Sequence, residues 1–337
     1  MEYIRDAGLN VFAKKALISS VVRLDVEKPI TYPDYVTAFG VEQSVSYSKI
    51  NKSENRINHR FSLFEMSGGS GFFISECLIV TNFHVAIGAY SIFAKLAGSE
   101  RELAVEGVEA FDIRNDLVVL KVAGEGMPLS LGDSNTVGDA DSIWAVGYPE
   151  GVAKINHGTV NGSQCCCNQI KMNIDTSAGS SGCPVLNSDG EVIGVDVSGD
   201  ELYSYAIPSN ELRRLIELER MPLSLKSWHN DPYVRAYIET REGDMKKEIG
   251  LYEEAVFHYN IAIDLDPHFC RAYRSRAEAK FGIRAFDEGF ADILSVLKLN
   301  PVSFSFSRLG AFVIWKRRVF QTTVARFFAG LYMKVVG

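Results

Sequence analysis

The chain has 337 residues, which is long enough for two domains of ordinary size. Hydrophobic residues make up 47% and charged residues 23%, the balance of a folded globular protein. The formal net charge of -7 argues against general nucleic-acid binding, because neutralising phosphates requires a basic face. No stretch approaches 18 uninterrupted apolar residues, and the first 22 residues lack the pattern of a secretory signal. We therefore expect a soluble, cytoplasmic protein.

The N-terminal half is rich in short strand-like runs. Clusters of Gly, Asn, Asp and Ser separate these runs, which predicts strands joined by turns. A polar stretch between residues 27 and 60 is expected to be a long surface loop or hairpin. The runs are ALISSVVRL, GFFIS, CLIVT, SIFAKL, LVVLKV, SIWAVG, IKMNID, EVIGVDV and LYSYAI. This half is predicted to be all-β, as one barrel or a pair of barrels.

The pattern changes to helical periodicity near residue 208. The segment PSNELRRLIELER predicts a helix, and residues 221–235 read as a linker. Beyond it, Pro267 and Pro301 lie 34 residues apart and each ends a helix-like segment. Small or aromatic residues occupy the positions where two helices must approach closely: Gly243, Gly250, Tyr252, Ala255, Tyr259 and Ala262.

Residues 236–303 thereby resemble the tetratricopeptide (TPR) repeat. Ala277 and Pro301 fit a second unit, which is weaker because Gly289 and Val296 replace the expected alanines. The last 34 residues, 304–337, contain six basic residues and no acid. They are expected either to cap the helical array or to lie on an anionic membrane surface as a basic amphipathic helix.

The segment DTSAGSSGCP, residues 175–184, raises the possibility of a serine nucleophile. Serine attacks only when a histidine takes its proton, and a carboxylate holds that histidine. Of the six histidines, only His84 directly follows an apolar strand. Asp116 opens the apolar run NDLVVLKV, although an aspartate before a strand can also be a simple turn residue.

The segments around these residues resemble the trypsin-fold proteases of the high-temperature-requirement family (HtrA, or Deg). TNFHVA at 81–86 is similar to the histidine turn of that family, and NDLVVLKV at 115–122 to its aspartate segment. LGDS, VGD, VGYPEG and HGTVNG follow in family order, and GSSGCP at 179–184 resembles the nucleophile loop. The resemblance covers residues 17–219 and implies a chymotrypsin/trypsin-like double β-barrel.

Roles for individual residues follow from this resemblance. It implies a catalytic triad of His84, Asp116 and Ser181, in the chain order of the trypsin fold. Gly179 lets the backbone turn so that the NH groups of Gly179 and Ser181 form the oxyanion hole, and Gly182 leaves room for substrate. No cofactor and no metal are expected.

The chain departs from the family pattern at two places in the loop. Ser180 replaces the usual Asp or Asn, and Cys183 replaces the usual second glycine. Either change could lower activity. Cys183 is a poorer nucleophile candidate than Ser181, because it lacks the preceding Gly-x pair. The run Cys165, Cys166, Cys167 has no partner spacing for a metal or a disulfide framework and is expected to hold free thiols.

Two alternative roles are open for Asp175, one in substrate specificity and one in the structure of the loop. It lies six residues before Ser181, where an acid at the floor of the primary pocket selects Lys or Arg. It also fits a structural aspartate of a shortened loop, hydrogen-bonded to backbone, since HtrA-type enzymes tend to prefer small apolar residues.

The domains are therefore predicted as protease 1–220, linker 221–235, TPR-like repeats 236–303 and a basic segment 304–337. Helical repeats stand where HtrA-type enzymes usually carry a PDZ domain. The expected function is a serine endopeptidase whose repeats recruit protein substrates or partners, with self-association also possible. The alternative is a degenerate protease-fold scaffold that acts through protein interactions. An acyl-transfer enzyme on another fold is set aside, because the nucleophile elbow Gly-x-Ser-x-Gly is missing.

Overall fold

The computed structural model describes residues 17–29, 64–96, 99, 101–162, 169–199, 203–218 and 221–299. The chain divides into two compact units, residues 1–238 and residues 239–337. The predicted loop at 27–60 and the basic segment at 304–337 lie largely or wholly outside the described residues. The membrane-surface and capping expectations for the basic segment therefore stay predictions.

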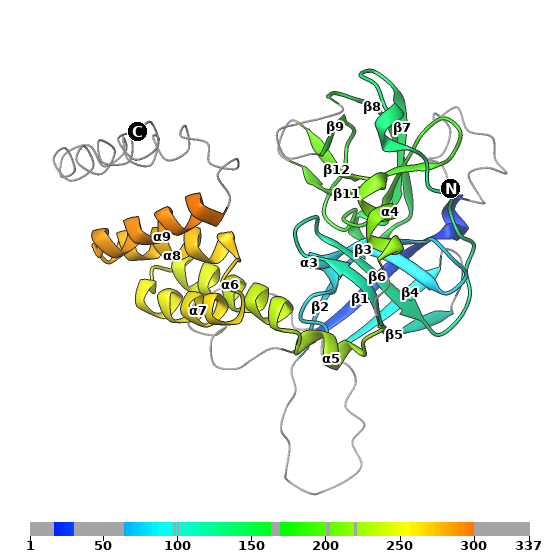
Figure 1. Cartoon of the computed structure of the whole chain (residues 1–337). Coiled ribbons are helices and arrows are strands. Elements are labelled where there is room, and N and C mark those ends of the chain that lie inside the picture. Colours follow the sequence, from blue (N-terminus) through cyan, green and yellow to red (C-terminus); the bar gives the residue numbers. More distant parts are fainter. Residues whose placement is uncertain are drawn as a thin grey trace, which may run out of the picture. The chain divides into compact units, whose positions relative to one another are not determined.

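The first unit contains two closed, antiparallel, six-stranded barrels (Figure 1). The order in the first barrel is β1-β2-β3-β6-β5-β4, and β1 closes it by pairing with both β2 and β4. Its strands are β1 (Val21–Pro29), β2 (Phe64–Phe73), β3 (Leu78–Asn82), β4 (Ser91–Leu96), β5 (Glu102–Asp112) and β6 (Leu117–Val122). The predicted pair of barrels is confirmed.

The second barrel has the order β10-β11-β12-β9-β8-β7, closed by pairing of β10 with β7. Its strands are β7 (Ser142–Gly147), β8 (Lys154–Val160), β9 (Ile170–Asn173), β10 (Pro184–Leu186), β11 (Val192–Gly199) and β12 (Ser204–Pro208). Sequence patterning missed β5, β8 and β10. In β8 only Val160 is buried, so it lacks an apolar run, and β10 is only three residues long.

A shared apolar core joins the two barrels. Phe72 and Val119 of the first barrel belong to the same buried cluster as Trp144 and Val195 of the second. Helix α4 (Ser209–Glu217), which confirms the helix predicted from residue 208, adds Leu212 to this cluster. The junction between the barrels is therefore packed, and residues on facing loops are held at fixed separations.

The segment predicted to be a linker packs on the first barrel instead. Leu223 pairs with Val108 of β5 through two backbone hydrogen bonds, of 2.7 and 2.8 Å. Helix α5 (Leu225–His229) buries Trp228 completely, edge-on to Phe83 with ring centroids 5.3 Å apart. This contact could not be predicted from the sequence, because Trp228 lies in a polar stretch and its aromatic partners come from distant parts of the chain.

The described part of the C-terminal region, up to residue 299, forms four helices: α6 (Pro232–Glu248), α7 (Tyr252–Leu265), α8 (Cys270–Gly282) and α9 (Phe286–Leu299). Small residues allow the close contacts. A Cβ added at Gly243 would lie 2.5 Å from the ring of Tyr259, and one at Gly289 would lie 2.4 Å from the ring of Phe281. The glycine that weakened the second repeat in the sequence thus makes room for Phe281.

Candidate active site

The first barrel holds a histidine and an aspartate in direct contact. Strand β3 ends at Asn82, and the short helix α3 (Phe83–Ala86) that follows carries His84. His84 Nδ1 lies 2.6 Å from Asp116 Oδ2, and the backbone NH of His84 donates to Asp116 Oδ1 at 2.8 Å. Two bonds to one carboxylate fix both the position and the ring orientation of His84. Its Nε2 is then the nitrogen left for proton transfer.

Asp116 is itself held in an unusual backbone conformation, with φ 54°. A positive φ at a residue other than glycine costs about 1 kcal/mol or more and persists when neighbouring groups determine it. The carbonyl oxygen of Asp116 accepts from the backbone NH of Phe83 at 3.0 Å and from Asn82 Nδ2 at 3.2 Å. The start of α3 therefore depends on Asp116, and the carboxylate cannot turn away without breaking several hydrogen bonds.

The second barrel supplies Ser181, in the loop between β9 and β10. Its Oγ donates to the carbonyl oxygen of Val197, on β11, at 2.8 Å. Within the described part of the chain, no hydrogen bond joins Ser181 to His84. The structure therefore couples His84 to Asp116 and leaves the hydroxyl of Ser181 on a backbone acceptor.

Ser70, on β2, connects the nucleophile loop to the first barrel. Its backbone NH donates to Ser181 O at 2.8 Å, and its Oγ donates to Gly179 O at 2.7 Å. The same Oγ accepts from the backbone NH of Tyr148 at 2.9 Å, and Thr81 Oγ1 donates to Ser70 O at 2.7 Å. No sequence pattern predicted a role for Ser70. Only the fold brings this serine to the loop.

The loop leaves two backbone NH groups unused. Those of Ser180, Gly182 and Cys183 donate to carbonyl oxygens of the protein. Those of Gly179 and Ser181, the two predicted for the oxyanion hole, donate to no group among the residues that the structure covers. Two unused donors beside a serine hydroxyl are the arrangement that binds a developing oxyanion.

Glycines at the two turns of the loop are sterically required. Gly179 has φ 94° and Gly182 has φ 87°, values that side chains rarely allow. A Cβ at Gly182 would lie 2.2 Å from the carbonyl oxygen of Ser70, which is backbone and cannot move aside. Any larger residue at 182 would therefore shift the loop away from the first barrel.

Cys183 is accommodated in the core of the second barrel. Cys183 is 1% exposed. A Cβ added at Gly147 would lie 2.8 Å from the Cβ of Cys183, so the missing side chain at Gly147 leaves space for the cysteine. Burial, assisted by the nearby charge of Asp196, raises the pKa of the Cys183 thiol well above its usual range. A neutral buried thiol is a poor nucleophile, which agrees with the preference for Ser181.

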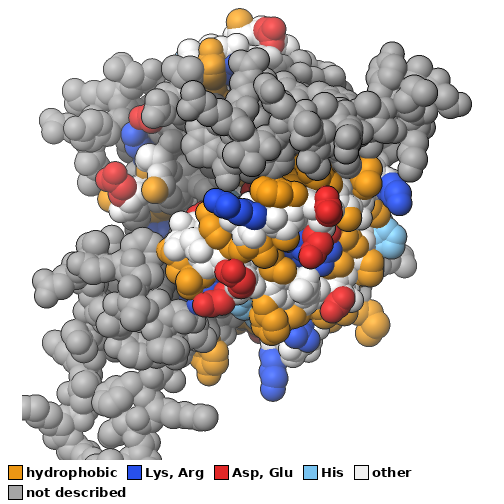
Figure 2. Space-filling view, turned by 90° about the vertical axis from the view of Figure 1, so that its left-hand side faces the viewer, with side chains coloured by type: hydrophobic (Ala, Val, Ile, Leu, Met, Phe, Trp, Pro, Cys, Tyr) orange, Lys and Arg blue, Asp and Glu red, His pale blue; other side chains and the backbone are white. Residues whose placement is uncertain are grey.

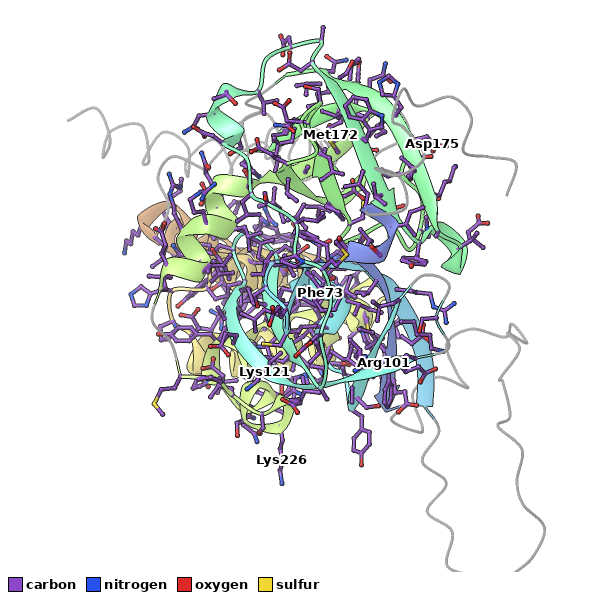
Figure 3. The ribbon with its side chains drawn as sticks, turned by 90° about the vertical axis from the view of Figure 1, so that its right-hand side faces the viewer. Phe73, Arg101, Lys121, Met172, Asp175 and Lys226 are labelled. Atoms are coloured by element: carbon purple, nitrogen blue, oxygen red, sulfur yellow. The ribbon has the colours of Figure 1, made fainter. Side chains whose placement is uncertain are left out.

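Asp175 lies at the surface of the second barrel (Figure 3). Its side chain is 84% exposed and is 3.9 Å from Lys154 Nζ. Met172, a few residues earlier, is fully buried inside the barrel. An exposed carboxylate is not the floor of a desolvated pocket, and its side chain makes no backbone hydrogen bond in the described chain. This placement favours neither role expected for Asp175.

Another acid is buried beside the loop. Asp196, on β11, is 1% exposed, and neither carboxyl oxygen has a hydrogen-bond partner among the described residues. Burial raises its pKa to about 7, while the Thr176 side chain acts in the opposite direction. Sequence analysis missed Asp196; the available signal was an acid inside the apolar run EVIGVDV.

Metal ligands and membrane helices were searched over the described residues alone. No group of three or more His, Cys, Asp or Glu side chains there could hold a metal ion. No helix in that part of the chain is long and apolar enough to cross a membrane. Cys165, Cys166 and Cys167 lie outside the described residues.

Two closed six-stranded barrels, with the histidine and aspartate on one and the serine loop on the other, define the trypsin-like class of peptidase domain. Residues 69–195 match the family model of the trypsin-like peptidase domain. The chain therefore contains such a domain.

Curated relatives that the chain matches include HtrA-type and DegP-like proteins. A probable periplasmic DegP-like serine endoprotease of Halomonas elongata is 38% identical over 140 residues, covering 38% of this chain and 28% of that protein. Human serine protease HTRA4 is 29% identical over 250 residues, covering 69% and 51%. The chain thus spans between about a quarter and about half of the length of these two relatives. A solved HtrA-type protease, AlgW with a tripeptide, is 22% identical with a TM-score of 0.46 and covers 61% of each chain.

Proposed function

We propose that this protein is a serine endopeptidase that cleaves protein substrates with Ser181, His84 and Asp116. The observation that carries the proposal is the contact between His84 and Asp116 at 2.6 Å, opposite a serine loop with two unused NH donors. The similarity to named serine endoproteases over the same residues supports it.

Catalysis begins with a rotation of the Ser181 side chain, which moves the hydroxyl hydrogen from Val197 O to His84 Nε2. Ser181 Oγ attacks the peptide carbonyl carbon while its proton passes to Nε2, and the Asp116 carboxylate stabilises the imidazolium through Nδ1–H. The NH groups of Gly179 and Ser181 bind the oxyanion. His84 then protonates the leaving amine, which leaves an acyl-serine, and water hydrolyses that ester by the same steps.

A second candidate function is a protease-fold scaffold without turnover. The bond from Ser181 Oγ to Val197 O favours it, because a nucleophile held on a backbone acceptor is not activated. The two candidates differ by a rotation about one side-chain bond of Ser181, and such rotations are fast compared with enzyme turnover. The reactivity of the Ser181 hydroxyl therefore decides between them, and it can be tested directly.

A fluorophosphonate probe, located by peptide mass spectrometry, is the test. We expect labelling at Ser181 in the natural protein, loss of labelling in Ser181→Ala, and retention in Ser180→Ala. Circular dichroism on each protein confirms that it is folded. A folded natural protein that takes no label, with or without protein substrates present, contradicts the endopeptidase and supports the scaffold.

The helical unit is proposed to act as TPR-like repeats that recruit protein substrates or partners. Positions 34 residues apart are buried in both helix pairs, as Ala255 and Gly289 are, and Ala262 and Val296. The unit also exposes large apolar side chains: Met245 at 46%, Ile249 at 46%, Leu251 at 40% and Phe257 at 62%. The face of the molecule drawn in Figure 2 mixes hydrophobic, acidic and basic side chains. Such a surface suits peptide binding better than nucleic-acid binding.

Phe257→Ala tests this role. We expect KM for a protein substrate to rise while KM for a short peptide stays unchanged, because only the larger substrate reaches the repeats. Equal KM values for both substrates in the variant and the natural protein count against recruitment through this residue. Self-association and location in the cytoplasm stay predictions; the Halomonas relative is named periplasmic.

A further inference from the structure

Asp196 is a buried acid that the proposed catalytic steps do not use. Its side chain is 1% exposed, and neither oxygen of its carboxyl group has a partner in the part of the chain that the structure describes. A buried carboxyl group without partners destabilises a fold by several kcal/mol on the usual scale of such groups. A group of this kind calls for a functional explanation.

The main chain places Asp196 directly beside the nucleophile. The NH of Gly182 donates to Asp196 O at 2.8 Å, and the NH of Asp196 donates to Cys183 O at 2.9 Å. The next residue, Val197, accepts the hydroxyl of Ser181 at 2.8 Å. In the trypsin fold, the substrate side chain that precedes the cleaved bond enters a pocket beside the nucleophile. Strand β11 therefore brings a carboxyl group to the region where that side chain must go.

The hydroxyl group of Thr176 acts on this carboxyl group and is linked in turn to a second hydroxyl group. Thr176, five residues before Ser181, is close enough to favour the ionised form of Asp196. Its Oγ1 also lies 2.7 Å from Ser204 Oγ, which donates to Ile174 O at 2.8 Å. Asp196 and Ser204 are buried, whereas Thr176 is half-buried and so reaches the surface. Several acceptors together suit a ligand with several N–H donors.

We propose that Asp196 determines specificity by binding the Lys or Arg side chain that precedes the cleaved bond of a protein substrate. This inference rests on the proposed endopeptidase function and names its substrate class. A lysine brings three donors and a positive charge, and an arginine brings five donors. Either one gives the unpaired carboxylate of Asp196 its missing partner. Asp175 is exposed, so water and salt would screen its attraction for a cation.

The electrostatics around Asp196 agree with this role. Burial raises the pKa of Asp196 to about 7, and among the described residues no positive charge acts on this carboxyl group. A charged group that is costly to ionise alone gains most from a cationic ligand.

The test compares fluorogenic peptides that differ only in the residue before the cleaved bond: arginine, its neutral isostere citrulline, and alanine. We expect kcat/KM for the arginine peptide to exceed that for the citrulline peptide by about 30-fold or more, the usual size of a buried charge pair. Asp196→Asn should remove most of that ratio, since the amide keeps the shape and loses the charge.

Two control variants locate the effect. Asp189→Asn changes an exposed turn residue of the same barrel and is expected to keep the arginine preference. Asp175→Asn tests the other acid. Loss of the preference in Asp175→Asn, with retention in Asp196→Asn, overturns the proposal.

Binding of 4-aminobenzamidine, an arginine-like fluorescent cation, separates this inference from the proposed function. The Ser181→Ala protein should bind it as the natural protein does, and Asp196→Asn should bind it about 30-fold more weakly. Fluorophosphonate labelling of Ser181 without arginine preference overturns the role of Asp196 and leaves the endopeptidase intact. Amidine binding without labelling supports Asp196 and removes the endopeptidase.

Discussion

The two barrels contribute unequal halves of the site. In the first barrel, His84 and Asp116 are joined by two hydrogen bonds, and Asn82 and Phe83 hold the backbone of Asp116. In the second barrel, the hydroxyl of Ser181 rests on Val197 O. The proposed base is already held in place by hydrogen bonds, whereas the proposed nucleophile still has to rotate.

The difference extends to residue chemistry. The departures from the HtrA-like pattern, Ser180 and Cys183, both lie in the second barrel. So does Asp196, whose carboxyl oxygens have no hydrogen-bond partner among the residues that the structure describes. Cys183 is absorbed by Gly147, which leaves space for its side chain. The first barrel thus holds the proposed proton-transfer pair, while the second barrel carries the departures from the family pattern and the acid proposed to select the substrate.

Among the variants, Asp116→Asn should cause one of the largest losses of activity, because it changes the residue that holds His84. We expect kcat/KM to fall by about 10⁴-fold, because an amide stabilises the wrong tautomer of His84 and does not stabilise the imidazolium. Steady-state hydrolysis of the arginine peptide measures the loss, and circular dichroism checks the fold. Activity within tenfold of the natural protein would show that the pair at 2.6 Å is not the catalytic pair.

Trp228→Ala tests how helix α5 packs on the first barrel. Trp228 is fully buried, 5.3 Å from Phe83 and 6.1 Å from Phe111 between ring centroids. We expect the free energy of unfolding to fall by about 3–5 kcal/mol, the usual cost of a large aromatic side chain in a core. Urea denaturation measures it. Tyr233→Ala, at a side chain 59% exposed, is the control and should change stability little. Equal effects in the two variants contradict the packing of α5 on the first barrel.

Asp196→Asn should remove one contribution to the pH dependence of the free energy of unfolding, namely that of the buried Asp196 carboxyl group. The folded pKa of Asp196 is about 7, above its ordinary value of 3.8. Between these values the folded protein binds more protons than the unfolded chain, so stability falls as pH rises from about 4 to about 7. The asparagine variant has no carboxyl group at position 196, so this decrease in stability with pH should disappear.

Urea unfolding at pH 4 and pH 8 measures the difference. Relative to the natural protein, the asparagine variant should gain on the order of 4 kcal/mol between the two pH values. Asp175→Asn, at an exposed position, should follow the natural protein. A difference between Asp196→Asn and the natural protein that does not vary with pH would mean that Asp196 is ionised in the folded state.

Ser180→Ala should have the smallest effect. Its backbone NH donates to Ser177 O at 2.9 Å, a contact that the substitution keeps, and its small side chain is buried. We expect kcat/KM to stay within about threefold of the natural value, against a loss of several powers of ten in Ser181→Ala. Matching losses in both variants would remove the assignment of the nucleophile to Ser181.

Much of the site was predictable because its residues come with local patterns. His84 follows an apolar strand, Asp116 opens one, and Ser181 lies between glycines whose positive φ values the turn requires. The contact between His84 and Asp116 was expected from the family resemblance. The link through Ser70 was not, because Ser70 and Ser181 are separated by 110 residues and no local pattern indicates their contact.

The sequence by itself determined the alternation of strands and turns, the change to helices near residue 208, and the order of the candidate catalytic residues, because all three are local patterns of residue type. Only the tertiary structure decided that Asp175 is exposed and Asp196 buried. Both acids lie within 15 residues of Ser181 in the sequence, and sequence alone does not distinguish their carboxyl groups. Burial depends on which strands pair across the barrel, and it is burial that gives a carboxyl group the capacity to select a cationic side chain.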